Sequence, residues 1–328
     1  MSWEILSRKG LWLPQIGWWL DAQTSQPRSI VTHAHSDHIA RHREIICTRA
    51  TSLFLARRLG RRRSEHVLPF GQTEQLTLDC TVTLFAAGHI LGSAMVLLQH
   101  QRHGSLLYTG DFKLRPSRAA ETCQPQRADV LVMETTFGLP RYVFPPAEEI
   151  EAGLTAYCRT ALAEGVTPVL HAYSLGKSQE LLQVVAAAGL PVLMHRTAAA
   201  FTRDYAAAGF PVAEHGLLAP ERASGAVVIC PQPMGGDNPA AWVHPRRTAL
   251  VSGWALDTSA RYRAGTDAAF PLSDHADFPE LLELVERVQP KVVYTVHGFA
   301  REFAATLRER GVEAWALGRE NQLGLTLA

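Results

Sequence analysis

One short segment constrains this chain more than any other: Ser29-Ile-Val-Thr-His33-Ala-His35-Ser-Asp37-His38. A β-branched run, typical of a buried strand, ends here in three histidines and one aspartate within six positions. Residues two apart in an extended chain point to the same side, so His33 and His35 can share one metal ion. The turn that follows can direct Asp37 and His38 at a second ion. The segment therefore predicts a metal site at the end of a strand.

The donors in this segment are imidazole nitrogens and a carboxylate oxygen, which suit zinc or manganese. The five cysteines, at positions 47, 80, 123, 158 and 230, include no Cys-x-x-Cys pair. This odd number argues against a disulfide framework and against a closed thiolate zinc site. We therefore expect open, water-binding catalytic sites and a reducing, cytoplasmic location. A histidine-rich surface loop that binds no ion is the alternative.

Two further candidate ligands follow β-runs later in the chain. His89 stands after the run 81–87 in Ala-Gly-His89-Ile-Leu-Gly, and Asp111 stands after the run 106–109 in Thr-Gly-Asp111-Phe. Taken alone, His89 would be a core or loop histidine and Asp111 a turn residue. Their position at strand ends, in series with the first segment, favours a shared metal site.

Hydrophobic patterning divides the chain into regions of different kind. Short β-runs with one early helix dominate up to about residue 134, a pattern that does not fit a doubly wound fold. From about residue 145, helices and strands alternate as in a parallel sheet, and the passage 231–239 is rich in turn residues. The expected strands are 18–20, 29–32, 44–47, 81–86, 94–99, 106–109, 130–134, 167–170, 191–194, 226–229, 291–296 and 312–317, and the expected helices are 50–59, 147–164, 176–188, 198–208, 278–288 and 301–310.

The composition is that of an ordinary globular protein, with 328 residues, 47% of them hydrophobic and 19% charged. Lys and Arg total 32 against 31 Asp and Glu, so a net charge of +1 gives no bulk attraction to nucleic acid or membrane. The apolar stretch behind Arg8 and Lys9 is broken by Pro14 and Gln15, so we expect no secretory signal. The longest apolar run, 181–194, is too short to span a bilayer.

The series His-x-His-x-Asp-His, later His and later Asp resembles the metal ligands of the metallo-β-lactamase superfamily. The resemblance implies the α/β (α+β) class and a four-layer αββα sandwich with a binuclear site at one edge. The run Trp18-Trp-Leu-Asp21 matches the first motif of that superfamily, in which the aspartate orients the metal-binding loop without touching the metal. A plain turn residue is the alternative for Asp21.

The rest of the chain carries four motifs that resemble the β-CASP nucleases of this superfamily. They are Val132-Met-Glu134-Thr-Thr-Phe-Gly, Ser174-Leu-Gly-Lys177-Ser-Gln-Glu, Leu272-Ser-Asp-His275-Ala-Asp and Tyr294-Thr-Val-His297-Gly. A small-molecule hydrolase of lactamase or glyoxalase type would leave them unexplained. The implied architecture is a metallo-β-lactamase domain, 1–138 and 269–328, with a smaller inserted β-CASP α/β domain, 139–268.

Within that family, Thr136-Phe-Gly-Leu-Pro-Arg-Tyr and Ser252-Gly-Trp-Ala are similar to bacterial DNA-ligase-associated exonucleases, which are mRNA 3'-end processing factor-like. This implies a DNA exonuclease that acts in DNA repair on DNA that is single-stranded or has a free end, with an ATP-dependent DNA ligase and a helicase as functional partners. The resemblance implies no membrane partner. His297 is a departure, because the RNA-processing branch has histidine there and the eukaryotic DNA-repair branch usually lacks it. An RNA-processing ribonuclease is therefore the alternative, and a non-catalytic scaffold subunit is disfavoured by the complete ligand set.

Carried over residue by residue, the resemblance implies a centre with two divalent metal ions, Zn²⁺ first and Mn²⁺ second. Two such ions can align an in-line displacement at phosphorus. His275 is the implied general acid, and Glu134 would hold its ring and favour the charged form. Without the resemblance, His275 would be a histidine at a helix N-terminus. The implied ligands are His33, His35 and His89 on one ion, Asp37, His38 and His297 on the other, and Asp111 on both, with Asp37 also counted as catalytic.

Two groups of residues are candidates for holding nucleic acid. Ser174 and Lys177 open an expected helix, where free backbone N–H groups and the helix dipole favour a phosphate. Ser174 as a simple N-cap is the alternative. The segment Arg57-Arg-Leu-Gly-Arg-Arg-Arg63 has five arginines in seven positions, and Arg61 and Arg62 are candidates for contact with a phosphate backbone. A solvated charged surface is the alternative there.

Overall fold

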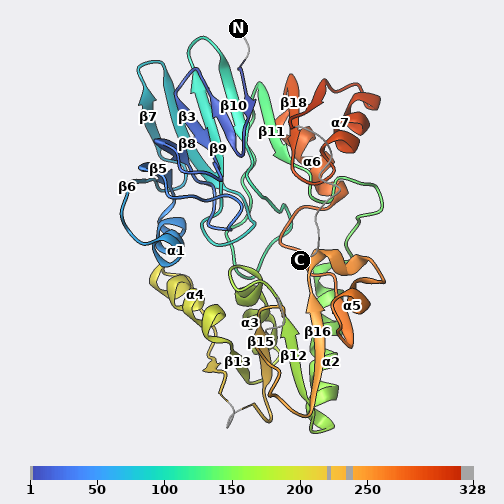
Figure 1. The fold of residues 1–328 in the computed structure, drawn as a ribbon. Helices are drawn as coiled ribbons and strands as arrows, with labels where there is room; N and C mark the ends of the chain where they lie inside the picture. The colour runs from blue at the N-terminus through green and yellow to red at the C-terminus, as the bar shows by residue number, and fades with distance from the viewer. Residues whose placement is uncertain (1–2, 220–222, 234–238, 319–328) are drawn as a thin grey trace. The chain divides into compact units, whose positions relative to one another are not determined.

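The computed structural model describes residues 3–219, 223–233 and 239–318 (Figure 1). Backbone contacts divide the chain into two compact units. Unit 1 consists of the residues up to Val143 and those from His275 onward, and unit 2 runs from Phe144 to Asp274. Unit 1 is thus built from two segments that are far apart in the chain. The expected domain boundaries, at 138/139 and 268/269, stay predictions.

The described part of unit 1 contains two sheets. The first has the strand order β1-β2-β3-β4-β5-β6, and the second has the order β19-β18-β11-β10-β9-β8-β7. The strands of the first sheet are β1 (Leu6–Ser7), β2 (Leu11–Leu13), β3 (Trp18–Leu20), β4 (Arg28–Ile30), β5 (Glu44–Cys47) and β6 (Ser64–Val67). Those of the second are β7 (Thr73–Thr77), β8 (Cys80–Ala86), β9 (Ala94–His100), β10 (Gly104–Tyr108), β11 (Val130–Glu134), β18 (Val292–Val296) and β19 (Ala314–Ala316).

Both faces of the second sheet are buried. Successive residues of a strand point to opposite sides, so each strand contributes side chains to two cores. In β10, Leu106 and Tyr108 belong to the core shared with the first sheet, whereas Leu107 belongs to the core shared with α6 (Phe278–Val288) and α7 (Ala300–Glu309). Helix α1 (Arg49–Leu59) contacts β6 of the first sheet. These layers confirm the expected fold class and αββα arrangement (Figure 1).

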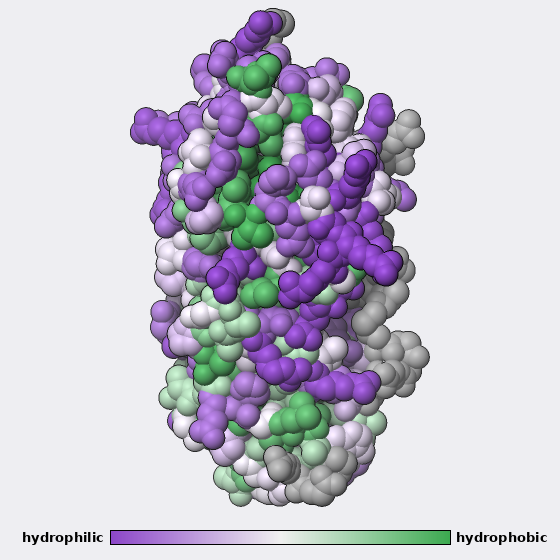
Figure 2. All heavy atoms as spheres, turned by 90° about the vertical axis from the view of Figure 1, so that its left-hand side faces the viewer, coloured by the Kyte–Doolittle hydropathy of each residue, from purple (hydrophilic) through white to green (hydrophobic). Residues whose placement is uncertain are grey.

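Local sequence signals explain where the helices of unit 1 begin and end. Helix α1 starts after Thr48, whose hydroxyl accepts the N–H of Thr51 at 3.3 Å, and it ends at Gly60 with φ 78°. Helix α6 starts at Asp277, which forms a reciprocal capping box with Glu280, both bonds measuring 3.1 Å. On the side of unit 1 that carries β6 and α1, hydrophilic side chains gather at the height of α1 (Figure 2).

Unit 2 has a parallel sheet with the strand order β14-β13-β15-β12-β16-β17. Its core joins Leu170, Val227 and Ile229 of the sheet to Leu181 and Val185 of α3. The strands are β12 (Thr167–His171), β13 (Val192–Met194), β14 (Gly216–Leu217), β15 (Val227–Cys230), β16 (Arg246–Val251) and β17 (Ala268–Phe270). The helices are α2 (Ala147–Ala163), α3 (Lys177–Ala187), α4 (Arg196–Ala207), the 3-10 helix η2 (Gly253–Leu256) and α5 (Ala260–Arg263).

The expected alternation of helices and strands in this region is confirmed, and every expected strand and helix of the chain is present within a few residues of its expected bounds. The sequence did not predict β1, β2, β6, β7, β14, β16, β17, η2 and α5. The expected turn-rich passage 231–239 lies partly outside the described residues. Within the residues that are described, no helix combines the length and the hydropathy needed to cross a membrane.

Candidate metal centre

The strands of unit 1 deliver the candidate ligands from their ends. His33 follows β4 by three residues, His89 follows β8, and Asp111 follows β10. Glycines make these turns possible, because Gly88 and Gly110 have φ angles of 79° and 54°. A Cβ atom at Gly110 would lie 2.6 Å from the hydroxyl of Thr32. The backbone before Asp111 therefore packs against the residue before His33, which brings the two side chains together.

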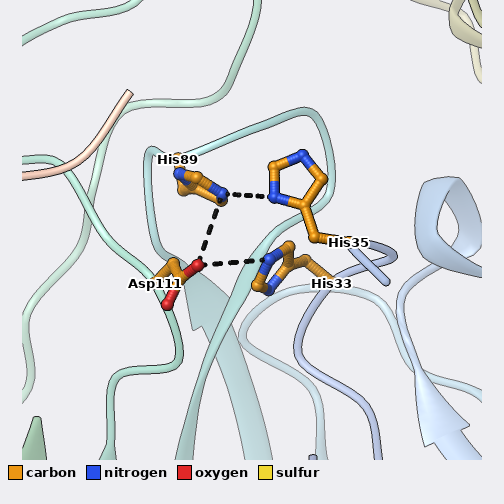
Figure 3. A group of neighbouring side chains, drawn as sticks. All are labelled: His33, His35, His89 and Asp111. Carbon is orange, nitrogen blue, oxygen red and sulfur yellow. Dashed lines mark hydrogen bonds and ion pairs between the residues drawn. The ribbon is translucent and has the colours of Figure 1, made fainter. Parts of the chain in front are cut away.

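Four of the predicted ligands form one cluster (Figure 3). The nearest donor atoms of His33, His35, His89 and Asp111 all lie within 4.8 Å of one another. His89 Nε2 lies 3.0 Å from His35 Nδ1, and Asp111 Oδ2 lies 3.5 Å from His33 Nε2 and 3.7 Å from His89 Nε2. Three imidazoles and a carboxylate thus point at one small volume.

The protonation states in this cluster fit a divalent metal. Burial, with His38 nearby, lowers the pKa of His33 well below its usual value, so the ring is neutral at physiological pH. Its Nε2 is buried and has no hydrogen-bond partner among the described residues. Burial would raise the pKa of Asp111, but His38, His275 and His33 together outweigh burial and hold this pKa well below the usual range. A neutral imidazole and an ionised carboxylate, as in His33 and Asp111, are the ligand forms that zinc requires.

The other three predicted ligands lie beside this cluster in a more open arrangement. His38 Nε2 is 3.3 Å from Asp111 Oδ2 and 3.7 Å from Asp37 Oδ2, and the rings of His38 and His297 are 5.5 Å apart. Asp37 and His297 are exposed. Burial lowers the pKa of His38, but Asp111 and Asp21 outweigh burial and raise it well above the usual value. The surroundings of His38 therefore favour a positive charge. Either a proton on the ring or a bound metal ion would supply that charge.

Asp21 lies behind His38 and holds its ring. Asp21 Oδ2 is 2.9 Å from His38 Nδ1 and also accepts the hydroxyl of Tyr108 at 3.0 Å. The backbone N–H and the hydroxyl of Thr32 donate to the two oxygens of Asp21, at 2.8 and 2.6 Å. With Nδ1 held in this way, Nε2 of His38 is the nitrogen directed at Asp111. Tyr108 and Thr32 escaped the sequence analysis, because each lies in an apolar run that indicates only a strand.

The buried Glu134 and the partly exposed His275 form a pair next to the cluster. Glu134, at the end of β11, is 1% exposed, and its Oε1 is 2.9 Å from His275 Nδ1. The same oxygen accepts the backbone N–H of Phe112 at 3.0 Å, and Oε2 accepts the hydroxyl of Thr136. Donor atoms of Asp111, Glu134 and His275 lie within 4.8 Å of one another. The His275 ring centroid is 4.6 Å from that of His89. His275 thus borders the candidate metal cluster.

Arg115 joins the segment that carries His275 to the loop that carries Asp111. Its guanidinium pairs with Asp277 at 3.2 Å and with Glu280 at 2.9 Å, and it lies 3.5 Å from the carbonyl oxygen of His275. The backbone N–H of Ala276 also donates to the carbonyl of Phe112 at 2.7 Å. Sequence reasoning missed Arg115, because a single arginine in a loop carries no pattern.

The candidates for nucleic-acid contact are placed differently from one another. Lys177 is 1% exposed, and its Nζ lies 2.9 Å from Glu180 Oε2 and 3.7 Å from Asp274 Oδ1, so two carboxylates already compensate its charge. Helix α3 is capped by Gly176, and Ser174 lies before the cap. Arg61 and Arg62 are exposed just beyond α1. The predicted phosphate contacts of these four residues stay predictions.

Comparison with known proteins gives matches along the whole chain. Residues 268–317 match the family described as a Zn-dependent metallo-hydrolase RNA specificity domain. A probable DNA ligase of Opitutus terrae is 54% identical over 99% of this chain and 32% of its own length. A probable RNase, MJ4, of Methanocaldococcus jannaschii is 24% identical over 77% of this chain and 68% of its own. The human DNA cross-link repair 1A protein is 31% identical over 50% of this chain and 16% of its own.

This chain spans about a third of the length of the ligase-named relative. The metallo-hydrolase match and the His/Asp cluster agree on the use of a divalent metal. The family follows from three observations together. They are the two packed sheets flanked by helices, the turns with candidate ligands at the strand ends, and these matches. The chain belongs to the β-CASP family of metal-dependent nucleases, within the metallo-β-lactamase superfamily.

Proposed function

We propose that this protein is a phosphodiesterase with two metal ions that degrades DNA from an end during repair. The observation that carries the proposal is the Glu134–His275 pair, 2.9 Å apart, beside the cluster of His33, His89 and Asp111. A metal cluster alone suits many hydrolytic reactions. A histidine held by a buried carboxylate at its edge adds the group that breaking a phosphodiester needs, a proton donor for the leaving oxygen.

The ligand roles in this proposal follow the cluster and its open neighbour. His33, His35 and His89 would hold one ion, Asp37, His38 and His297 would hold the other, and Asp111 would serve both, with Zn²⁺ preferred over Mn²⁺. When bound, the two ions would neutralise phosphoryl charge and supply an activated water. Asp21 keeps the imidazole of His38 oriented through its 2.9 Å contact with Nδ1.

His275 would act as general acid. Its Nδ1 is occupied by Glu134, which leaves Nε2 as the atom that can give a proton to the sugar oxygen as its bond to phosphorus breaks. The carboxylate of Glu134 favours the protonated ring that this step needs. After the step the ring is neutral and recovers a proton from solvent, to which its side chain is 21% exposed.

The DNA substrate and the repair role are supported by the relatives. A relative named as a probable DNA ligase is 54% identical over 99% of this chain, and only 32% of its length is matched. That arrangement supports an ATP-dependent DNA ligase as functional partner, and a helicase is proposed on the family resemblance alone. The five cysteines are buried and unpaired, which supports a cytoplasmic location.

An RNA-processing ribonuclease is the second candidate. It is favoured by the match of residues 268–317 to a domain described by its RNA specificity, and by a relative named as a probable RNase. His297 lies inside that matched range. The metal ligands and His275 would have the same roles on either substrate, so only the choice of polynucleotide separates the two candidates.

The test is cleavage of end-labelled single-stranded DNA and RNA of one sequence. Metal-stripped protein is assayed alone, with Zn²⁺ and with Mn²⁺, beside the Asp111→Ala variant. Progressive shortening of DNA from one end, with RNA spared, is the expected result, and the gel also gives the polarity. Preferential cutting of RNA would replace the first candidate by the second. No cleavage of either polynucleotide would reject both.

A further inference from the structure

Unit 1 contains a cavity of about 380 Å³ beyond the C-terminal end of α1. We call it the arginine pocket, since each of its formally charged lining residues is an arginine. It is lined by Arg41, His42, Leu59, Gly60, Arg61, Arg62 and Arg63. Its volume is roughly ten times the ~30 Å³ that a water molecule takes up in the liquid, so a phosphate group with several waters fits inside.

One buried side chain of this pocket, that of Arg63, has a polar hydrogen that lacks an acceptor among the described residues. The side chain of Arg63 is 3% exposed; Nη1 donates to the carbonyl of Gly60 at 2.7 Å and Nη2 pairs with Glu65 at 2.7 Å. Arg63 Nε has no hydrogen-bond partner among the described residues. A buried donor without an acceptor destabilises the protein, so the site favours a ligand that accepts hydrogen bonds.

His42 is the other buried polar side chain of the lining. It is 3% exposed, and its Nδ1 accepts the backbone N–H of Gln26 at 3.2 Å, which places the ring proton on Nε2. Burial lowers the pKa of His42, although Asp21 and a hydrogen bond to the backbone of Ala22 oppose the change. The ring is therefore neutral at physiological pH and adds no charge to the pocket.

The charge of the pocket is positive and largely uncompensated. Glu65 pairs with Arg63, but Arg41, Arg61 and Arg62 are exposed and form no ion pair with a described residue. Three arginines therefore face a cavity in a chain whose total net charge is only +1. Arginine forks match the oxygens of phosphate or carboxylate in bidentate pairs. The hydrophilic side chains at the height of α1 in Figure 2 lie on this side of unit 1.

The pocket is connected to the metal-binding loop through the chain itself. His42 comes four residues after the candidate ligand His38. Asp21, which holds the ring of His38 at 2.9 Å, is also near enough to act on the pKa of His42. Burial lowers the pKa of Arg58, in the last turn of α1, and the charge of Asp37 opposes this change. Arg41 and His42 of the pocket therefore belong to the same chain segment as the candidate ligand His38.

We propose that the arginine pocket binds a phosphate group of the polynucleotide strand, beyond the phosphodiester that lies at the metal centre. This inference rests on the proposed nuclease function. A polynucleotide repeats its phosphates along the strand, so a strand held at the metal loop presents further phosphates to basic groups on the same loop. The buried Nε–H donor of Arg63 then receives a phosphate oxygen as its acceptor.

The test compares two triple variants that remove the same amount of charge. The pocket variant combines Arg41→Ala, Arg61→Ala and Arg62→Ala, and the control variant combines Arg8→Ala, Arg127→Ala and Arg310→Ala, all of them exposed arginines of unit 1. Binding of a labelled single-stranded oligonucleotide to metal-stripped protein is measured over a range of salt concentrations. Hydrolysis of bis-p-nitrophenyl phosphate by the metal-loaded proteins reports the metal centre alone, because this substrate has one phosphate.

The pocket variant should bind the oligonucleotide about tenfold more weakly than wild type, and its salt slope should be smaller by about 0.7 for each phosphate that it no longer neutralises. The control variant should change binding less than the pocket variant does, and all three proteins should hydrolyse the small diester alike. Equal binding by the two variants would overturn the pocket while leaving the nuclease proposal intact. If wild type hydrolyses the diester but binds no oligonucleotide, the polynucleotide itself is rejected as the occupant.

Discussion

Glu134 Oε1 lies 2.9 Å from His275 Nδ1, although 141 positions separate the two residues in the chain. The same oxygen accepts the backbone N–H of Phe112, one residue after Asp111. One buried carboxylate therefore ties together the end of β11, the loop with a candidate metal ligand and the candidate acid. Glu134 therefore helps to fix the distance from the candidate acid to the metal cluster, and each part can be tested separately.

Replacement of His275 by alanine should lower turnover by roughly a hundredfold or more, because the leaving oxygen loses its proton donor. The metal content should stay that of wild type, because His275 is not one of the predicted ligands and Asp111 and Glu134 are unchanged in this variant. Turnover and metal content of one preparation are measured together, the latter by elemental mass spectrometry. Loss of metal from this variant would instead make His275 a ligand.

Replacement of Asp111 by alanine should abolish cleavage and leave the fold intact. Asp111 Oδ2 lies within 3.7 Å of His33, His38 and His89, so its loss removes the carboxylate common to both sets of ligands. Circular dichroism checks the fold, and cleavage of labelled DNA checks activity. Activity above about a hundredth of wild type would reject the bridging role.

The Asp21→Asn variant should weaken metal binding about 10–100-fold, the usual effect of losing a partner that orients a ligand. The amide keeps the size of the side chain but cannot accept hydrogen bonds at both of its ends. Tyr108→Phe is the matched control, because it removes one donor to Asp21 and leaves the contact with His38 at 2.9 Å. Metal titrations of both variants should separate them. Equal affinities would mean that Asp21 has only a structural role.

The Arg115→Ala variant should lower turnover without changing the affinity for metal, because the guanidinium of Arg115 holds the backbone of His275 and its neighbours Asp277 and Glu280. It should also destabilise unit 1 by about 2 kcal/mol, since Asp277 and Glu280 would be left buried without their cation. Denaturant unfolding and steady-state kinetics test the two effects. The Arg115→Lys variant, which keeps the charge, should recover more of the stability than of the turnover.

The ligand turns were predictable from the sequence, whereas the contacts that support them were not. His33, His35, His89 and Asp111 each follow an apolar run that ends abruptly, and the fold then brings strand ends together. The contacts of Arg115 and of the Phe112 N–H join residues that are far apart in the chain, and they leave no local pattern.

Burial was likewise hidden from the sequence. Lys177 stands at a helix start, where a free lysine would suit a phosphate, but Asp274 reaches it from nearly a hundred residues later and helps to bury it. The strands β6 and β7 escaped prediction because their side chains are mostly polar and partly exposed, so no alternation marks them. β16 escaped because its first residues, Arg246 and Arg247, are charged.

Asp129 should make the stability of unit 1 depend on pH in the acid range. The Lys291 ammonium, at 2.7 Å, and the N–H and hydroxyl of Ser105, both at 2.9 Å, lower the pKa of Asp129 to about 2. A carboxyl with a folded pKa below its unfolded value of about 3.9 stabilises the protein fully above that value and loses this contribution as the pH falls towards 2. The side chain is 35% exposed, so solvent screening limits the contribution to about 1 kcal/mol or less.

The Asp129→Asn variant isolates this contribution, because the amide keeps the shape and cannot ionise. Metal-free wild type and variant are unfolded in urea at pH values of about 7, 5, 4 and 3, which bracket the unfolded pKa. Wild type should be more stable than the variant at the two higher pH values, and the difference should shrink at the two lower ones. A difference that stays constant over this range would show that the hydrogen bonds of Asp129, and not its charge, carry its effect on stability.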